Sequence, residues 1–212
     1  MKVVLVYVFA NLMSAKYEPM ARRFAQSYCD HPPGETNHDL IVVVNGGGPI
    51  TPRQERLFDP LVPKFIRHDN SGKDLGAYLL AARTIPADLM IFMGSPSRPR
   101  TSGWLDTMVL AMEDNGPGVY GPWGQSVPRP HLKTTVFFCS PELILSYPHD
   151  ITDSNRYFFE FGEDSITRFA LRNGFNVAQV TARGVFPVEQ FHMVANEDCL
   201  VLDQFTDTLN YT

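Results

Sequence analysis

The sequence predicts an α/β fold, with a mostly parallel central sheet and helices on both of its faces. Short apolar runs rich in β-branched residues alternate with stretches of helical periodicity, which is the strand and helix order of crossover units. The chain has 212 residues, enough for one domain with a sizeable core, and 44% of them are hydrophobic. No internal repeat or clear linker divides it. We therefore expect a single domain.

The first half of the chain should contain four strands and two helices. In chain order we expect a strand at residues 3–9, a helix at 17–28, strands at 40–44 and 65–67, a helix capped by Asp74, and a strand at 89–93. The run at 3–9 follows one lysine, as in a secretion signal, but its short length and β-branched residues favour a buried parallel strand. Later apolar stretches are too short to span a membrane.

The second half is predicted to begin with a helix near Thr101 or Ser102. Trp104, Met108 and Met112 recur at four-residue spacing and should form its buried stripe. A later helix has Ile166, Phe169 and Ala170 at helical spacing and ends at 173–174, with Glu163 and Asp164 expected in its first turn. We place the domain at residues 1–195 and an acidic, weakly patterned tail at 196–212.

Polar residues follow each of the four early strands. Because the carboxyl ends of parallel strands meet at one edge of the sheet, ligands of such folds bind in the crevice there. The polar residues at these ends include Asn11, Asn45 with three following glycines, the run from His68 to Lys73, and Ser95 with Ser97. The sequence thus predicts one polar crevice.

Several common nucleotide and catalytic motifs do not occur in the sequence. The glycines after Asn45 lack the G-x-G-x-x-G spacing, and neither a phosphate-binding P-loop nor a G-x-S-x-G elbow is found. The six histidines are dispersed without the spacing of metal ligands, and the three scattered cysteines indicate free thiols in a reducing compartment. We therefore expect a cytoplasmic protein. A net charge of -5 disfavours a polyanionic partner.

Six segments together resemble a known family. They read LIVVVNGG, DNSGKDLGAYLLAA, ADLMIFMGSPSRPRTSGWL, GVYGPWG, HLKTTVFFCSPELI and FGEDSITRFALRNGFNV. In order and spacing they resemble the GT-A-type nucleotide-sugar glycosyltransferases, close to the family-2-like and rhamnan-synthesis proteins, over roughly residues 1–190. The resemblance implies a GT-A-like domain with a Rossmann-like nucleotide-binding half. It also implies transfer of a sugar from a nucleotide sugar, preferably a UDP-sugar, to a hydroxyl acceptor.

The resemblance also assigns roles to residues of the crevice. Asn45 would contact the uracil, Asn70, Gly72, Gly76 and Ala77 would lie near the nucleoside, and residues 103–105 would support the sugar pocket. Small side chains such as Gly76 and Ala77 serve close helix packing equally well. The full set of expected donor-binding residues is Asn11, Asn45, Asp69, Asn70, Gly72, Lys73, Ser95, Ser97 and Arg98.

Two adjacent carboxylates are the candidate catalytic groups. Asp164 is our candidate for the base that takes the proton from the acceptor hydroxyl, and Glu163 would share this task or orient the acceptor. Glu160 is a third candidate. The simpler interpretation is that acids near a helix start only stabilise the helix.

The chain departs from the family at the metal site. Where the family's fourth strand delivers an Asp-x-Asp that holds a divalent metal, this sequence has Ser95, Pro96 and Ser97. No metal ligand is therefore assigned, and Mg²⁺ or Mn²⁺ stays an open option without its usual carboxylates. Nearby cationic side chains, or a tryptophan, would then bind the phosphates or the acceptor. The alternative for the cations is that they form only a solvated basic loop. The candidates are Trp123, His131, Lys133 and His192, with Arg98, Arg100 and Arg129.

Three functions agree with these features. The first is sugar transfer by direct displacement without the usual metal, with inversion implied by the resemblance. The second is a degenerate protein that only binds nucleotide sugars, against which the intact Gly162-Glu163-Asp164 argues. The third is glucosylation of hydroxymethylated DNA bases, as by some phage transferases of this general fold. The acidic total favours a saccharide or small-molecule acceptor over DNA.

Overall fold

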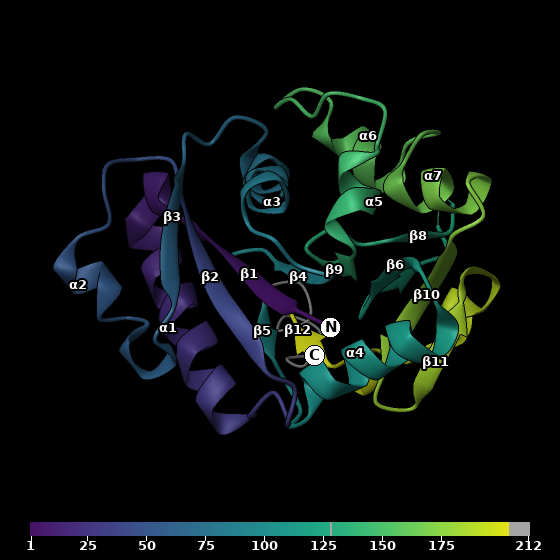
Figure 1. The fold of residues 1–212 in the computed structure, drawn as a ribbon, viewed down its shortest axis with the longest axis horizontal. Helices are drawn as coiled ribbons and strands as arrows, with labels where there is room; N and C mark the ends of the chain where they lie inside the picture. Colours follow the sequence, from purple (N-terminus) through teal and green to yellow (C-terminus); the bar gives the residue numbers. More distant parts are fainter. Residues whose placement is uncertain (128, 204–212) are drawn as a thin grey trace.

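The computed structural model describes residues 1–127 and 129–203. Its centre is an eight-stranded sheet in the order β11-β10-β6-β9-β4-β1-β2-β3, with helices on both faces (Figure 1). The strands of this sheet are β1 Val3–Ala10, β2 His38–Asn45, β3 Lys64–His68, β4 Leu89–Met93, β6 Gly118–Gly121, β9 Val136–Cys139, β10 Asn176–Thr181 and β11 Gly184–Pro187. Short strand pairs are formed by β5 Arg98–Pro99 with β12 Val201–Leu202, and by β7 Gly124–Gln125 with β8 His131–Leu132.

The sheet confirms the predicted α/β class. Strands β3, β2, β1 and β4 are parallel neighbours, and β6 is parallel to β10, whereas β9 and β11 run antiparallel to their neighbours. The helices are α1 Ser14–Asp30, α2 Pro52–Glu55, α3 Lys73–Thr84, α4 Trp104–Asn115, α5 Pro141–Leu145, α6 Arg156–Phe161 and α7 Ile166–Arg172. The 3-10 helices are η1 Asn11–Met13, η2 Asp59–Leu61, η3 Val188–Met193 and η4 Asn196–Asp198. Within the described ranges, no helix is both long and apolar enough to cross a membrane.

Two cores lie on opposite faces of the sheet. Alternate residues of β1, such as Leu5 and Tyr7, pack with α1 and α4, where Phe24 and Trp104 are fully buried. The residues between them on β1, such as Val6, pack with α3, α5, α6 and α7 (Figure 1). Because both faces are covered, strands β1 and β2 are apolar along most of their length rather than alternating. Each such buried side chain contributes about 1.5–3 kcal/mol.

The boundaries of two helices correct the sequence predictions. Helix α3 begins at Lys73 after Gly72, whose φ of 67° is left-handed, so Asp74 lies in the first turn and does not cap the helix. Helix α7 begins at Ile166, and the Ser165 hydroxyl accepts the first-turn N–H of Arg168. Glu163 and Asp164 therefore precede the cap instead of lying in the first turn. The serine hydroxyl takes the place at the cap that the carboxylates were expected to favour.

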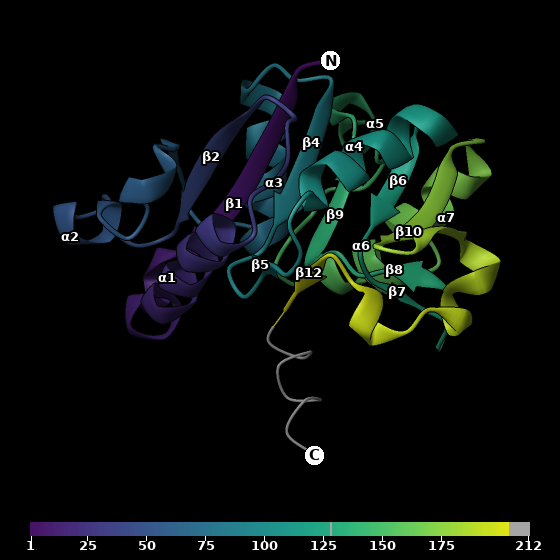
Figure 2. The ribbon, with the colours of Figure 1, turned by 90° about the horizontal axis from the view of Figure 1, so that it is seen from below.

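The chain continues into the fold beyond residue 195. Strand β12 pairs with β5 (Figure 2). Cys199, Leu200 and Val201 are buried. The division into a domain at 1–195 and a tail at 196–212 stays a prediction, and residues 204–212 of that tail lie outside the described residues.

Candidate functional site

A crevice lies at the carboxyl ends of the parallel strands, where the sequence predicted one. Its volume is about 540 Å³. It is lined by the ends of β1, β2 and β4, by η1, α1 and the start of α3, and by Arg156 of α6. Four of the predicted donor-binding residues line it together: Asn45, Asn70, Lys73 and Ser95.

Asn45 is held in one orientation by a histidine. The side chain is 2% exposed, and its Oδ1 lies 2.8 Å from Nδ1 of His68 at the end of the neighbouring strand. Burial lowers the pKa of His68, although the Asp69 carboxylate opposes this. The imidazole is therefore neutral at pH 7, and the pair brings a fixed amide to the crevice without a charge.

The turn before α3 has an unusual backbone. Asn70, Gly72 and Lys73 all have left-handed φ angles, of 76°, 67° and 57°. Glycine and asparagine adopt this region at little cost, whereas lysine does so less readily. Asp153 supports the turn from outside, because its Oδ1 accepts the Gly72 N–H at 2.8 Å and its Oδ2 lies 2.6 Å from Lys73 Nζ. The side chain of Lys73 lines the crevice.

Ser95 follows β4, at the position where the resemblance predicted a metal-binding aspartate to be replaced. Its hydroxyl donates to the Val8 carbonyl at 2.7 Å and accepts the Ala10 N–H at 3.2 Å, while Tyr7 donates to the Ser95 carbonyl. The serine thus joins the ends of β4 and β1. Ser97 is buried, and its hydroxyl has no partner among the described residues. Within the described ranges, no cluster of three or more histidine, cysteine or acidic side chains is suited to a metal ion.

Sequence reasoning missed two charged residues of the crevice, Asp74 and Arg156. Burial raises the pKa of the Asp74 carboxyl, while backbone N–H groups and the charge of Arg156 oppose this shift. The Arg156 guanidinium lies 4.5 Å from the ring centre of Tyr157 and donates to the Tyr157 hydroxyl at 2.7 Å. Asp74 was visible in the sequence only as a supposed helix cap, and no motif pointed to Arg156.

Other predicted donor residues support loops around the crevice and do not line it. Asn11 donates to the Gly48 carbonyl at 3.0 Å and accepts from Gln54 at 2.8 Å. Asp69 accepts the N–H and hydroxyl of Ser71. Gly72, Ser97 and Arg98 are likewise outside the lining, and Arg98 lies on β5. Gly76 lies against the backbone of the turn that precedes α3, since a Cβ there would collide with the Ser71 carbonyl oxygen.

The predicted acceptor or phosphate residues are not gathered in the crevice. Trp123 is 4% exposed and donates to the Val201 carbonyl at 2.9 Å, with Lys133 Nζ 5.5 Å from its ring centre. His131 is buried, with Nδ1 2.7 Å from the Arg129 carbonyl oxygen, and His192 is exposed on η3. Because Trp123 is covered by the β12 segment, its ring belongs to the core. The roles predicted for these residues stay predictions.

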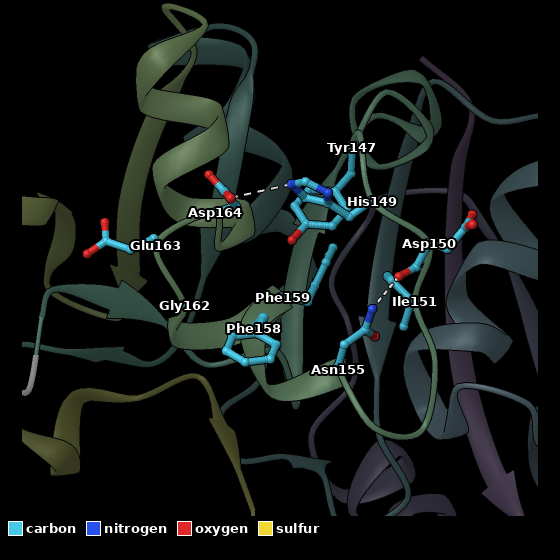
Figure 3. Close-up of a pocket in the computed structure, with 10 residues that line it drawn as sticks. All are labelled: Tyr147, His149, Asp150, Ile151, Asn155, Phe158, Phe159, Gly162, Glu163 and Asp164. Carbon is cyan, nitrogen blue, oxygen red and sulfur yellow. Dashed lines mark hydrogen bonds and ion pairs between the residues drawn. The ribbon is translucent and has the colours of Figure 1, made fainter.

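A second pocket holds the candidate base. Its volume is about 420 Å³, and Asp164 points into it toward His149 (Figure 3). Asp164 Oδ1 accepts from Arg172 at 2.6 Å, and Oδ2 lies 3.5 Å from His149 Nε2. The hydrogen bond from Arg172 lowers the pKa of this carboxyl, so the group is ionised at neutral pH. The pKa is set by these two side chains.

The other two candidate carboxylates have different surroundings. Glu163 forms ion pairs with Arg129 and with Arg168, the latter at 3.2 Å, and its side chain points away from Asp164 (Figure 3). Glu160 accepts the N–H and hydroxyl of Thr134 at 2.8 and 2.5 Å. Both therefore hold neighbouring loops in place, whereas Asp164 is the carboxylate that faces the pocket.

One segment of chain lies between the crevice and the pocket. Ile151 and Asn155 line the pocket, whereas Arg156, the next residue along, lines the crevice. We call residues 151–156 the partition segment. Asp153 fastens it to the start of α3 through Lys73 and Gly72. The candidate base and the donor crevice are thus neighbours with a shared wall.

Comparison with known proteins shows a likeness in fold. No family model and no curated protein matches this chain. Among solved structures, a CMP:2-keto-3-deoxy-manno-octonic acid synthetase complexed with CTP superposes with a TM-score of 0.55 at 11% identity, covering 84% of this chain and 88% of that one. S. aureus TarS 1-349 in complex with UDP gives 0.53 at 15% identity, covering 75% and 54%. A mannosyltransferase from Pyrobaculum calidifontis in complex with GDP-Man and Mn²⁺ gives 0.54 at 13%, covering 73% and 50%.

The chain shares its fold with these three structures, a mixed, mostly parallel central sheet flanked by helices. The likeness extends over about half the length of TarS 1-349 and of the mannosyltransferase.

Proposed function

We propose that this protein transfers a sugar from a nucleotide sugar, preferably a UDP-sugar, to a hydroxyl group of an acceptor. The observation that carries the proposal is the crevice at the carboxyl ends of β1, β2 and β4, where two amides and two cations meet. Asn45 and Asn70 supply the amides, and Lys73 and Arg156 supply the cations. A nucleoside diphosphate needs both kinds of group, because its base is recognised by directed hydrogen bonds and its phosphates by positive charge.

In this proposal, each part of the donor lies against side chains of the crevice that suit its chemistry. The nucleoside lies against Asn45 and Asn70, and the diphosphate lies near Lys73 and Arg156. Lys73 is half-buried and already paired with Asp153, so a diphosphate would share or replace that carboxylate. TarS in its complex with UDP supports this choice of ligand class through its similar fold. A cytoplasmic location, where nucleotide sugars would be at hand, is part of the proposal.

The reaction is a direct displacement at the anomeric carbon. The acceptor oxygen forms a bond to that carbon, the bond from carbon to the diphosphate oxygen breaks, and Asp164 takes the acceptor proton. The negative charge that develops on the diphosphate is stabilised by Lys73 and Arg156. Inversion of the sugar follows from a single displacement. Asp164 is suited to the role of base because it is ionised and faces a pocket beside the crevice. The displacement requires the partition segment between them to move aside, so that the acceptor oxygen held at Asp164 reaches the anomeric carbon.

The residues present do not form the family's usual metal site. The crevice lining has one carboxylate, Asp74, and the hydroxyl of Ser95 is engaged in joining two strands. We therefore derive no step through a metal ion, and the dependence on Mn²⁺ is a question for the experiment.

Nucleotidyl transfer is the second candidate function. It is favoured by the extent of the likeness in fold, which covers 88% of the synthetase chain but 54% of TarS 1-349 and 50% of the mannosyltransferase. Such an enzyme binds a nucleoside triphosphate and a free sugar, whereas a glycosyltransferase binds a nucleotide sugar. Donor binding therefore separates the two.

The deciding experiment is calorimetric binding of UDP-, GDP- and dTDP-sugars and of CTP, each with Mn²⁺ and with EDTA. We expect one nucleotide sugar to bind and to be hydrolysed slowly, also in EDTA. Arg156→Ala should weaken this binding by about 10- to 100-fold, since a charge-assisted hydrogen bond contributes about 1.5–3 kcal/mol. Arg22→Ala, on the exposed side of α1, is the control and should bind as the parent does.

Three other results of this binding experiment would contradict sugar transfer. Binding of CTP in preference to every nucleotide sugar indicates the synthetase reaction. Binding of a nucleotide sugar without hydrolysis or transfer to any acceptor indicates a degenerate binding protein. If no nucleotide binds, the fold has lost this use and the proposal is wrong.

A further inference from the structure

The pocket of Asp164 has an unusual aromatic lining. Tyr147, Phe158 and Phe159 contribute rings to it, and Asp164 and His149 contribute the polar groups that face one another (Figure 3). Phe159 is buried against Tyr147, at 4.8 Å between ring centres. Phe158, in contrast, is 62% exposed, and its ring has no aromatic partner in the part of the chain that the structure describes.

The hydroxyl of Tyr147 is a second group available to a ligand. Within the described ranges, it forms no hydrogen bond, and it points into the pocket (Figure 3). A half-buried phenol usually finds a partner when its ring is packed, as the Tyr147 ring is against Phe159 and Phe169. An exposed ring and an unpaired hydroxyl thus face the same space as an ionised carboxylate.

We infer that this pocket binds a neutral pyranose ring of a saccharide acceptor, with the apolar face of the sugar on Phe158 and its hydroxyls on Tyr147 and Asp164. The inference rests on the proposed function, because only a sugar-transfer reaction makes the bound saccharide an acceptor. The C–H groups of one pyranose face carry partial positive charge and pack on the negative face of an aromatic ring. Sugar hydroxyls donate to a carboxylate and accept from a phenol. The aromatic ring of the pocket thus suits the apolar face of a pyranose, and the carboxylate and phenol suit its hydroxyl groups.

Charge disfavours DNA as the acceptor in this pocket. Its lining contains Asp150, Glu163 and Asp164 but neither lysine nor arginine. Around it, residues 141–175 hold six acidic and three basic side chains. Arg168 and Arg172 of α7 are already paired with Glu163 and Asp164. A phosphate backbone requires a row of available cations, which this surface does not offer.

The test measures binding of methyl pyranosides to the whole protein, in the absence of nucleotide, by saturation-transfer NMR and titration. The set contains the methyl glycosides of glucose, galactose, N-acetylglucosamine and rhamnose. We expect at least one to bind at millimolar concentration. Phe158→Ala should weaken it about tenfold, the loss of one stacking contact, whereas Phe158→Tyr should retain it. Tyr147→Phe should weaken binding without loss of the stacked geometry.

Leu110→Ala is the matched control. Leu110 is 54% exposed on α4, on the opposite face of the sheet, so its loss should not affect pyranoside binding. Unfolding curves of each variant show whether lost binding reflects lost structure, and Phe158→Tyr gives a second reading if Phe158→Ala unfolds.

Three results would overturn the inference. They are no binding of any pyranoside, binding that is equal in Phe158→Ala, and salt-sensitive binding of a single-stranded oligonucleotide that displaces the pyranoside. These outcomes are independent of the donor, which binds in the crevice. If pyranosides bind but no nucleotide sugar does, the pocket stands and sugar transfer fails. If nucleotide sugars bind and pyranosides do not, the proposed donor site stands and the inference about the pocket is wrong.

Discussion

The donor side and the acceptor side of this molecule hold their functional groups by different means. In the crevice, Asn45 and Ser95 are buried and fixed by a histidine or by backbone groups of neighbouring strands. In the pocket, Asp164 is exposed and fixed by a flexible arginine and a histidine, beside the exposed ring of Phe158. The polar groups of the crevice are therefore anchored in the hydrophobic core, whereas those of the pocket lie on the surface, beside the short helices α6 and α7. Substitutions in the two regions should therefore have different effects. The largest difference is expected in the free energy of unfolding, and smaller ones in the pKa values of carboxyl groups.

The largest expected difference is in stability, between the core on which the crevice is built and the exposed ring of the pocket. Phe92 of β4, the strand that leads to Ser95, is fully buried, with ring centres 5.0 Å from Tyr78 and 4.9 Å from Phe137. Phe92→Ala should lower the free energy of unfolding by about 3–5 kcal/mol. Phe158→Ala, on the acceptor side, should change it by less than about 0.5 kcal/mol. Urea denaturation followed by circular dichroism measures both. Equal losses would mean that the two regions are not held differently.

A smaller effect is expected at Asp74, the partly buried carboxylate of the crevice. Burial raises the pKa of Asp74 above its value in the unfolded chain, so the folded protein binds more protons between these two pKa values. Stability from this group is present at low pH and is lost as the pH rises through the folded pKa. Asp74→Asn should therefore raise the thermal midpoint at pH 7, with a gain that shrinks toward pH 4.

Thermal unfolding between pH 4 and pH 8 measures this difference. Asp114→Asn, an exposed carboxylate of α4, is the control and should follow the parent at each pH. A lower midpoint for Asp74→Asn at pH 7 would show that the carboxylate stabilises the fold, contrary to the prediction.

The smallest effect on the fold is expected at the ion pair of the pocket. The Arg172 hydrogen bond holds the pKa of Asp164 below its ordinary value, so its contribution to stability is present above the ordinary pKa and lost as the pH falls through the lowered one. Arg172→Ala should raise this pKa and leave the unfolding curve at pH 7 nearly unchanged, because the pair is exposed.

Carboxyl NMR titration between pH 2 and pH 6 measures the shift. Arg168→Ala, which removes a partner of Glu163, is the matched control and should leave the Asp164 pKa in place. If Asp164 is the base, the acid limb of kcat/KM moves to higher pH in Arg172→Ala only. An unmoved Asp164 pKa would show that His149 sets it.

The sequence was most informative where one local pattern determines structure. The strand at 89–93 was placed correctly because a run of large apolar residues is buried on both faces. Asn45 and Ser95 were found at the crevice because parallel strands bring their carboxyl ends together. In contrast, Arg156 reaches the crevice through a loop whose path depends on Asp153, far along the chain from Lys73. The cap at Ser165 was missed because two carboxylates beside it have the same preference for a helix start.

Ser95 also has a consequence for any attempt to give this protein the family's metal. An aspartate at position 95 would remove the hydroxyl that donates to the Val8 carbonyl and would place a carboxylate against that oxygen. An Asp-x-Asp motif introduced at residues 95–97 therefore starts with a folding penalty, since Ser95 joins β1 and β4. Residue 97 offers no easier start, because its side chain is buried and lies outside the crevice lining, where an added carboxylate would lose its hydration without reaching the crevice.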